Sequence, residues 1–244
     1  MKKFPLFFAL LLLFSCDEFP FLTDSENAAG LKSALEVGAN YALKTLGKED
    51  GFLLDQAVKI GLPEDAAKLI HTAKTNPVLA PVLGALAKEI EQQLVLTINR
   101  AAEAAIDGVI PIVITAITDM TIQDATTILF SSNNRAATDY LKVKTYDPLS
   151  NACAPVIEGA VNKEVVPGLS AQSVWDKLAG LNNGIANILP SLVQPIETDL
   201  SLYTTQKTLD GVFKKVGDEE VKIRTDVSAR VNDLLKRVFG QLDK

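Results

Sequence analysis

The sequence has 244 residues, and its 24 lysines and arginines against 30 aspartates and glutamates give a net charge of −6 at neutral pH. Binding to nucleic acid or to an anionic membrane surface depends on clustered basic side chains. After the first fifteen residues the longest basic run is Lys214-Lys215, and Asp218-Glu219-Glu220 follows it closely, so we expect no nucleic-acid partner.

The first fifteen residues have the pattern of an export signal rather than of a membrane span. Lys2 and Lys3 precede an apolar run, at 4–14, that is about half of the ~20 residues needed to cross a bilayer. Leu13-Phe14-Ser15-Cys16 then has the form of a bacterial lipobox, in which the cysteine thiol receives diacylglycerol and becomes the N-terminus after cleavage. The alternative is an ordinary signal peptide with an incidental cysteine.

We therefore predict a lipoprotein signal peptide at 1–15, a lipidated tether at 16–22 and a single all-helical domain at 23–244. Several acyl chains on Cys16 would hold the protein stably on a lipid bilayer, which is its first expected partner. The acidic residues directly after Cys16 are of the kind that sort lipoproteins between membranes. We expect the periplasmic face of a bacterial envelope membrane, such as the outer membrane, and leave surface exposure open.

The first predicted helices are marked by capping residues. Thr23-Asp-Ser-Glu26 has the form of a capping box, and apolar residues then recur at helical spacing until Gly47. The stretch 48–62 has no clear period and is predicted to be a loop. Pro63-Glu64-Asp65 predicts a new helix, because proline suits the first helical position and acids suit the positive end of the helix dipole. Asn76-Pro77 marks the next boundary.

The middle of the chain contains the longest helical pattern. One apolar stripe covers 79–105 and is predicted to end before Gly108. A separate, buried helix is predicted at 110–120, where many β-branched residues leave a strand possible. Thr121-Ile-Gln-Asp124 predicts another helix start, and SSNNR at 131–135 breaks that pattern.

The remaining third completes an all-α prediction. Asp147-Pro148 is predicted to cap a helix that runs past Cys153, and 165–199 is rich in Gly, Pro and Asn, which favours short helices with irregular links. Two closing helices have apolar stripes at 209–223 and 227–238. Many helix caps and few alternating segments predict a single-domain irregular helical bundle of about eight to ten helices.

Few residues are available for catalysis or metal binding. His71 is the single histidine and is expected to be a surface or partly packed side chain, because no nucleophile motif accompanies it. Cys153 lies in an apolar segment, which predicts a buried thiol rather than a reactive one. Zinc needs three or four nitrogen or sulfur ligands and calcium a ring of oxygens, and neither pattern occurs. We expect no metal and no cofactor.

Several polar residues could meet as a cluster inside the otherwise apolar bundle. Arg100 and Glu103 lie one turn apart, and Asp218–Lys222 and Glu220–Arg224 are acid-first pairs four residues apart. The alternative is that each set is a solvated or salt-bridged helix face. If buried, such charges would have to be paired, and they would then mark a candidate site. The candidate polar cluster comprises Asn99, Arg100, Glu103, Asp139, Tyr140, Asp210, Glu219, Glu220 and Arg224.

Distinctive phrases occur along nearly all of the predicted mature chain. They are DGFLLDQAVKIGLP (50–63), NRAAEAA (99–105), DMTIQDATTIL (119–129), AATDYL (136–141), TLDGVF (208–213), and EEVKIR with LLKRVFG (219–240). In these phrases the sequence resembles a bacterial family, domain of unknown function 4197. Asp55, Gly61 and Val227 stand where Asn, Pro and Pro are common in the family. The resemblance implies an exported, often lipidated, single-domain envelope protein, and it implies no catalytic residue.

Three functions are compatible with the sequence. We favour a non-enzymatic lipoprotein that binds an envelope protein or serves an assembly, because of the anchor, the acidic charge and the scarcity of catalytic residues. The alternative is a periplasmic carrier of an apolar small molecule or lipid, since 109–130 and 165–198 could open a pocket between helices. A carboxylate-based hydrolase or metal-dependent enzyme would have to use the candidate polar cluster.

Overall fold

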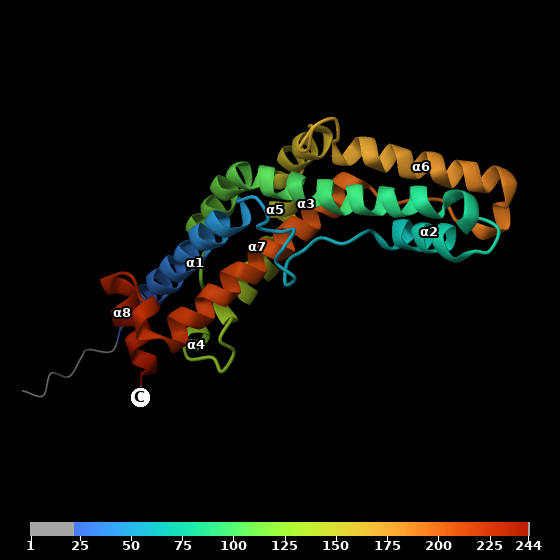
Figure 1. The fold of residues 1–244 in the computed structure, drawn as a ribbon. Helices are drawn as coiled ribbons and strands as arrows, with labels where there is room; N and C mark the ends of the chain where they lie inside the picture. Colours follow the sequence, from blue (N-terminus) through green and yellow to red (C-terminus); the bar gives the residue numbers. More distant parts are fainter. Residues whose placement is uncertain (1–21, 244) are drawn as a thin grey trace, which may run out of the picture.

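The structure, a computed structural model, describes residues 22–243, which form eight α-helices and three short 3₁₀ helices (Figure 1). The α-helices are α1 (Asp24–Leu46), α2 (Glu64–Thr75), α3 (Ala80–Asp119), α4 (Ala125–Leu129), α5 (Ala136–Asn162), α6 (Ala171–Ile188), α7 (Leu200–Thr225) and α8 (Asp233–Phe239). The 3₁₀ helices are η1 (Pro190–Leu192), η2 (Val227–Ala229) and η3 (Gly240–Leu242). The predicted all-α class and number of helices are confirmed. The predicted signal peptide and Cys16 lie outside the described residues.

Both ends of α1 lie where the sequence predicts them. Thr23 Oγ1 accepts a hydrogen bond from the N–H of Glu26 at 3.2 Å, and the carboxylate of Glu26 accepts one from the N–H of Thr23 at 2.9 Å. This reciprocal capping box satisfies N–H groups that have no partner within the helix. Gly47 follows the last residue of α1, and the predicted loop at 48–62 then leads to α2.

α3 is one continuous helix of 40 residues where the sequence predicted two. Gly108 does not end the helix. A Cβ there would lie 2.6 Å from Cγ1 of Val156, so glycine at this position allows α5 to approach α3 closely. Pro111 lies on the exposed side of the helix, and so does Asp107, whose carbonyl loses its helical partner and faces water instead. The proline is therefore tolerated inside the helix.

The apolar composition of α3 reflects its place in the core. Its length and its mean hydropathy of 1.6 over 18 residues would suit a membrane span, but its buried side chains pack on α1, α2, α5 and α6. The segment 110–120 is helical to Asp119, so the possible strand was wrong. Val113 and Ile117 are buried while Thr115 is exposed, so the helix predicted to be buried is buried on one face only.

α5 also runs further than predicted. It begins at Ala136, directly after SSNNR, and continues through Pro148 and Pro155 to Asn162. Asp147-Pro148 therefore lies inside a helix and caps none, which corrects the prediction. Both prolines are exposed, so the carbonyl groups that they leave without a partner lie on the solvent side of the helix.

The C-terminal third differs from its prediction in two places. α6 is a single helix of 18 residues, not a set of short helices, and η1 and an extended segment connect it to α7. The predicted helix at 227–238 begins only at Asp233. Asp226 accepts a hydrogen bond from the N–H of Ser228 and so caps η2, while Asn232 caps α8 separately. These two caps, at Asp226 and Asn232, divide the predicted helix into η2 and α8.

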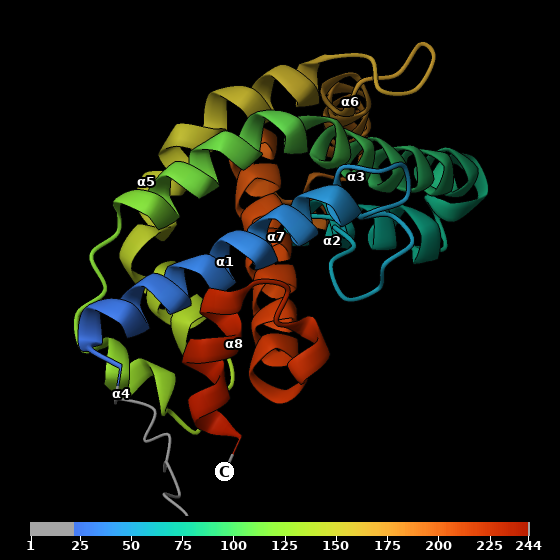
Figure 2. The ribbon, with the colours of Figure 1, turned by 90° about the vertical axis from the view of Figure 1, so that its left-hand side faces the viewer.

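Four helices form the body of the molecule. α1 packs on α3 and α7, and α5 packs on the same two helices, so these four surround one core (Figures 1 and 2). α4 and α8 close one end of the body beside the first turn of α1 (Figure 2). At the other end the N-terminal half of α3 extends outward between α2 and α6 (Figure 1). We call this extension, made of α2, α6 and residues 80–98 of α3, the arm.

Candidate functional site

Asn99 and Glu103 on α3 bind the backbone of the loop at 48–62. Asn99 Oδ1 accepts a hydrogen bond from the N–H of Ile60 at 2.9 Å, and its Nδ2 donates to the carbonyl of Ile60 at 2.8 Å. Glu103 Oε1 accepts from the N–H groups of Phe52 and Leu53 at 3.0 and 3.1 Å. We call this set the loop clamp, because two buried side chains supply hydrogen-bond partners that the irregular loop cannot find within itself.

Arg100 completes the loop clamp. Its Nη1 donates to Glu103 Oε2 at 2.6 Å, and its Nη2 donates to Asp50 Oδ1 at 2.7 Å. Burial alone would lower the pKa of Arg100, but the hydrogen bonds and charges of Glu103 and Asp50 outweigh it and raise the pKa. Asp50 has a φ of 67°, an unusual conformation for a residue with a side chain, and the contact with Arg100 holds it there.

Glu220 and Arg224 on α7 form a second clamp, the helix-end clamp. Glu220 accepts hydrogen bonds from the N–H groups of Ala137 and Thr138 at 3.0 and 2.7 Å, and from the Thr138 hydroxyl at 2.6 Å. These N–H groups belong to the first turn of α5, where a helix has donors without internal partners. Glu220 therefore caps α5 from another helix.

Arg224 is held by Glu220 and binds the end of α4. Its Nε donates to Glu220 Oε1 at 2.8 Å, and its two terminal nitrogens donate to the carbonyls of Leu129 and Ile128 at 2.7 and 3.1 Å. Both side chains of the pair are fully buried. A buried ion pair is tolerated only when its remaining hydrogen-bonding capacity is used, and here it binds two helix ends at once.

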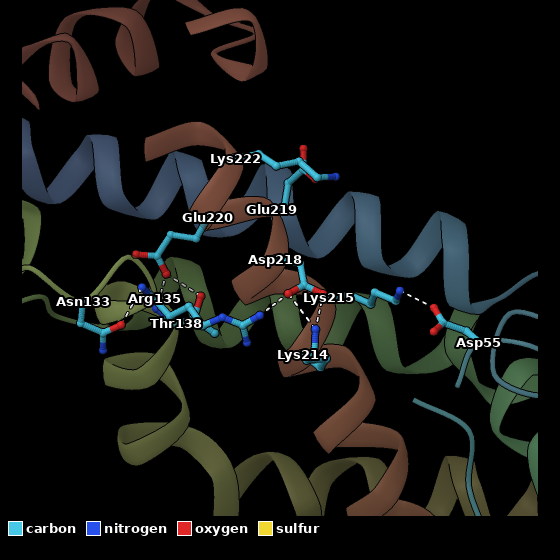
Figure 3. Close-up of polar contacts among 10 residues, drawn as sticks. All are labelled: Asp55, Asn133, Arg135, Thr138, Lys214, Lys215, Asp218, Glu219, Glu220 and Lys222. Atoms are coloured by element: carbon cyan, nitrogen blue, oxygen red, sulfur yellow. Dashed lines mark hydrogen bonds and ion pairs between the residues drawn. The ribbon is translucent and has the colours of Figure 1, made fainter. Parts of the chain in front are cut away.

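Further ion pairs along α7 connect the two clamps (Figure 3). Lys215 binds Asp55 of the loop at 48–62, and Asp218 binds both Lys214 and Arg135, which precedes α5. The hydrogen bond from Lys215 is the largest cause of the lowered pKa of Asp55. α7 is thus fixed to the loop on one side and to the start of α5 on the other.

Glu219 faces α1 and not the clamps. Its carboxylate binds Lys222 at 2.8 Å, and Lys222 Nζ lies 4.6 Å from the centre of the Tyr41 ring on α1. The predicted pair Asp218–Lys222 was wrong. Lys222 forms an ion pair with Glu219, and Asp218 forms ion pairs with Lys214 and Arg135. The predicted pairs Arg100–Glu103 and Glu220–Arg224 are present.

The other candidates lie apart from one another. Asp139 accepts a hydrogen bond from Asn133 at 2.8 Å, and the Tyr140 hydroxyl donates to the carbonyl of Thr121 at 3.0 Å. Asp210 binds Lys142 at 2.9 Å and lies 3.3 Å from the hydroxyl of Tyr146. Burial and the nearby Asp210 charge raise the pKa of Tyr146 to about 12. The nine candidates therefore form two clamps and separate surface pairs, and not one cluster.

The chemistry of the clamps is the binding of backbone groups. Within residues 22–243, no group of three or more His, Cys, Asp and Glu side chains is arranged to hold a metal ion. His71 is exposed, as predicted. Cys153 is fully buried, and burial raises the pKa of its thiol to about 11, which agrees with the predicted unreactive cysteine.

A family model described as Protein of unknown function (DUF4197) matches residues 21–240. The chain belongs to this family. No curated protein and no solved structure matches the chain. The phrases in which the sequence resembles the DUF4197 family contain the clamp residues: 50–63 forms the loop, 99–105 and 219–224 supply the clamping side chains, and 119–129 and 136–141 supply the helix ends that are clamped.

Sequence reasoning identified the clamping side chains of this DUF4197 protein but missed the ion pairs that connect the two clamps. Arg135, Lys215 and Asp55 were not among the candidates, although Asp55 lies in the phrase 50–63. The two residues of the Asp55–Lys215 pair are 160 positions apart, and those of Arg135–Asp218 are 83 apart. No local spacing indicates pairs of this kind, because they form only when the helices pack.

The arm contains an apolar groove that the candidate cluster did not include. The groove lies between α3 and α6 and has a volume of about 440 Å³. It is lined by Leu83, Leu86, Ile90, Lys177, Gly180, Leu181 and Gly184. Leu86 is exposed as well as lining the groove, Val82 is exposed one turn earlier on α3, and Val78 is exposed in the turn that leads into α3. Two segments, 165–198 and 109–130, were expected to help form a pocket. Residues of 165–198 line this groove, but those of 109–130 do not, because the lining from α3 lies at 83–90.

Proposed function

We propose that this chain is a membrane-anchored envelope lipoprotein that binds a partner protein through the apolar surface of its arm. The observation that carries the proposal is the exposed apolar row of Val78, just before α3, and Val82 and Leu86 on α3, of which Leu86 lines the groove. Apolar side chains at helical spacing next to a groove suit an amphipathic partner helix, which packs its own apolar face against them. The lipobox pattern at Cys16 supports the anchor.

The two clamps support a role other than catalysis for the polar residues. A catalytic carboxylate must reach a substrate, whereas Glu103 and Glu220 are buried and direct their oxygens at backbone N–H groups and at an arginine. Of the residues that the hydrolase alternative would use, Asn99, Arg100, Glu103, Glu220 and Arg224 are engaged in holding the loop and the helix ends.

Site-specific photocross-linking in living cells tests the partner proposal. A photoreactive phenylalanine derivative would replace Val82 in the lipidated chain, with Val143 on α5 as the matched control. These valines have exposed fractions of 77% and 82%, but Val143 lies on the body. We expect a discrete product from position 82, identified by mass spectrometry as one protein and absent from position 143. No product at 82, or the same products at both positions, would refute the proposal.

The anchor has a test of its own. Cells supplied with an alkyne fatty acid should incorporate it into the wild-type protein and not into the Cys16→Ala variant. The mass of the N-terminal peptide from the membrane fraction should show an acylated Cys16. A wild-type peptide without acyl mass would remove the anchor from the proposal and leave the binding role to the cross-linking experiment.

The groove itself favours a second function, the carrier of an apolar small molecule or lipid. Its lining is mostly aliphatic, and Lys177 at its side could pair with a carboxylate or phosphate head group. Native mass spectrometry of the chain starting at Asp17, purified from the periplasm without detergent, would show a releasable lipid or metabolite. Gly180→Leu, which fills the groove, should remove that excess mass. A bare protein mass would favour the partner proposal.

A further inference from the structure

We propose that the end of the molecule opposite the arm rests on the lipid surface, with Phe130, Val227 and Val231 in contact with the bilayer interface. We call these three side chains the proximal face. The inference rests on the proposed lipid anchor and adds to it a defined orientation of the folded chain on the membrane.

The position where the tether enters the fold is fixed at this end. Asp24 accepts hydrogen bonds from the N–H and the hydroxyl of Thr126 on α4, at 2.8 and 2.9 Å. Glu26 binds Arg237 of α8 at 2.9 Å. The first turn of α1 is thus held by both helices that close this end of the body (Figure 2).

The tether is too short to let this end move far from the membrane. Thr23 is seven positions after Cys16, and a fully extended chain spans at most about 3.3–3.6 Å per residue, so the reach is at most about 25 Å. The arm lies at the far end of an elongated molecule (Figure 1). The proximal face, and not the apolar row on the arm, is therefore the exposed apolar surface nearest the anchor.

The buried arginines hold the proximal face together. Arg224 donates to the carbonyl of Leu129, the residue before Phe130, at 2.7 Å, and Arg230 donates to the carbonyl of Ile223 at 3.0 Å. Arg224 thereby ties the end of α7 to the end of α4, and Arg230 ties the segment containing Val227 and Val231 to the end of α7. Phe130, Val227 and Val231 have exposed fractions of 51%, 60% and 68%. Three large apolar side chains exposed around the entry of a lipid tether suit the apolar zone of a bilayer interface.

Three basic side chains around this face are paired with carboxylates, Arg230 with Asp243 among them, while Asp226 is exposed and, within residues 22–243, bound only by Ser228. Arg237 binds Glu26, Lys236 binds Asp233, and Asp226 accepts hydrogen bonds from Ser228. Attraction to anionic head groups would need unpaired basic side chains, so the contact should depend on apolar burial and little on salt. Three side chains give weak affinity, but the tether keeps the face at an effective concentration of the order of mM, which is enough to populate a weak contact.

Fluorescence quenching in vesicles tests the orientation. The mature lipidated chain, with Val227→Cys or Val231→Cys, would be labelled with bimane and placed in phosphatidylethanolamine–phosphatidylglycerol vesicles that contain a nitroxide-labelled lipid. Val82→Cys on the arm is the control, and native Cys153 stays unlabelled because it is buried. We expect at least twofold stronger quenching at 227 and 231 than at 82, unchanged by 0.5 M salt. Equal quenching at all three positions, or stronger quenching at 82, would overturn the inference.

A second variant and a second anchor keep the test independent of the proposed function. Val227→Asp with Val231→Asp should abolish quenching of a label at Phe130→Cys, while the circular dichroism spectrum stays unchanged; persistent quenching would count against the face. If Cys16 proves not to be acylated, a histidine-tagged chain from Asp17 on nickel-chelating lipid replaces the anchor. Quenching at 227 in that system supports the docking face even when the lipid anchor has failed, and its absence refutes the face.

Discussion

Glu220 has no exposed surface, yet it accepts three hydrogen bonds from the start of α5 and one from Arg224. At the scale of the single residue, this is how the fold accommodates a buried charge: each oxygen has donors, and the paired arginine has acceptors of its own on α4. Removing one member leaves the other charge buried without its partner, which costs more than the pair contributes as a whole.

Glu220→Gln should therefore lower the free energy of unfolding by about 3 kcal/mol, because the amide removes one acceptor oxygen and leaves Arg224 buried and unpaired. Glu219→Gln is the matched control, since the neighbouring carboxylate pairs only with half-exposed Lys222, and it should cost less than about 1 kcal/mol. Urea unfolding followed by circular dichroism measures both. Similar losses in the two variants would contradict the helix-end clamp.

Asp55 gives a prediction about acid stability. Its pKa is lowered in the folded chain, mainly by the hydrogen bond from Lys215, so the folded state holds this proton less tightly than the unfolded state does. The resulting stabilisation is present above the ordinary value of 3.8 and is lost as the pH falls through the lowered pKa. In urea titrations between pH 6 and 2, Asp55→Asn should reduce the dependence of stability on pH. Parallel curves for variant and wild type would refute this.

At the scale of the element, side chains from other helices define the loops and helix ends. The loop at 48–62 has no period of its own, and its backbone is held by Asn99 and Glu103 from α3. α5 lacks a side-chain cap from its own N-terminal residue and takes Glu220 instead. These elements depend on long-range contacts more than on local propensity.

Asn99→Ala should release the loop while leaving α7 intact, because both hydrogen bonds to Ile60 are lost and the buried backbone groups must find water. Hydrogen–deuterium exchange should become faster at 50–62 and stay unchanged in 205–224. Gln92→Ala, at an exposed position of the same helix, is the control and should change neither segment. Uniform acceleration in the Asn99 variant would indicate global destabilisation instead.

Two glycines should respond to alanine with opposite signs. Gly108→Ala places a Cβ against Val156 of α5 and should destabilise the protein by about 1–3 kcal/mol despite a better helix propensity. Gly159→Ala on α5 meets nothing within 4 Å and should stabilise by up to about 1 kcal/mol. Thermal unfolding measures both changes, and Val156→Ala should relieve the first. Stabilisation by Gly108→Ala would show that α3 and α5 are less closely packed.

At the scale of the whole molecule, one core joins two ends with different surfaces. The body closes with α4 and α8 where the chain enters, and the arm extends α3 in the other direction (Figure 1). An anchor at the first end and a binding surface at the second would hold a partner away from the membrane. The proposed function and the proposed orientation both depend on this separation.

Cys153 reports on the integrity of the whole core. Its side chain is fully buried and its pKa is raised to about 11. In the folded chain a reagent therefore cannot reach the sulfur, and the thiol is not deprotonated at pH 8. The chain from Asp17 should show no thiol reactive with a disulfide reagent at pH 8, and full reaction in guanidinium. The rate at low denaturant should follow global unfolding. Rapid reaction of the native protein would contradict the packing around α5.

Local sequence patterns predict the helix class, the caps of α1, the loop at 48–62 and the polar pairs Arg100–Glu103 and Glu220–Arg224, because each depends on residues that lie close together in the chain. They could not determine that α3 continues through Gly108 and Pro111, or that α5 continues through Pro148. A glycine does not end a helix when it packs against another helix, and a proline is tolerated inside a helix when it faces solvent. Tertiary packing then outweighs these local helix-stop signals.

The contacts of the polar residues follow from the packing of the helices. Asn99, Glu103, Glu220 and Arg224 were correctly selected as unusual, but their partners are backbone groups of segments 39 to 96 residues away. The type and spacing of a polar side chain show that it needs a hydrogen-bonding partner. They do not show which partner, because that partner comes from a distant segment of the chain. The separation of an anchored end from an arm likewise follows from how eight helices pack, since no residue pattern specifies which ends of those helices meet.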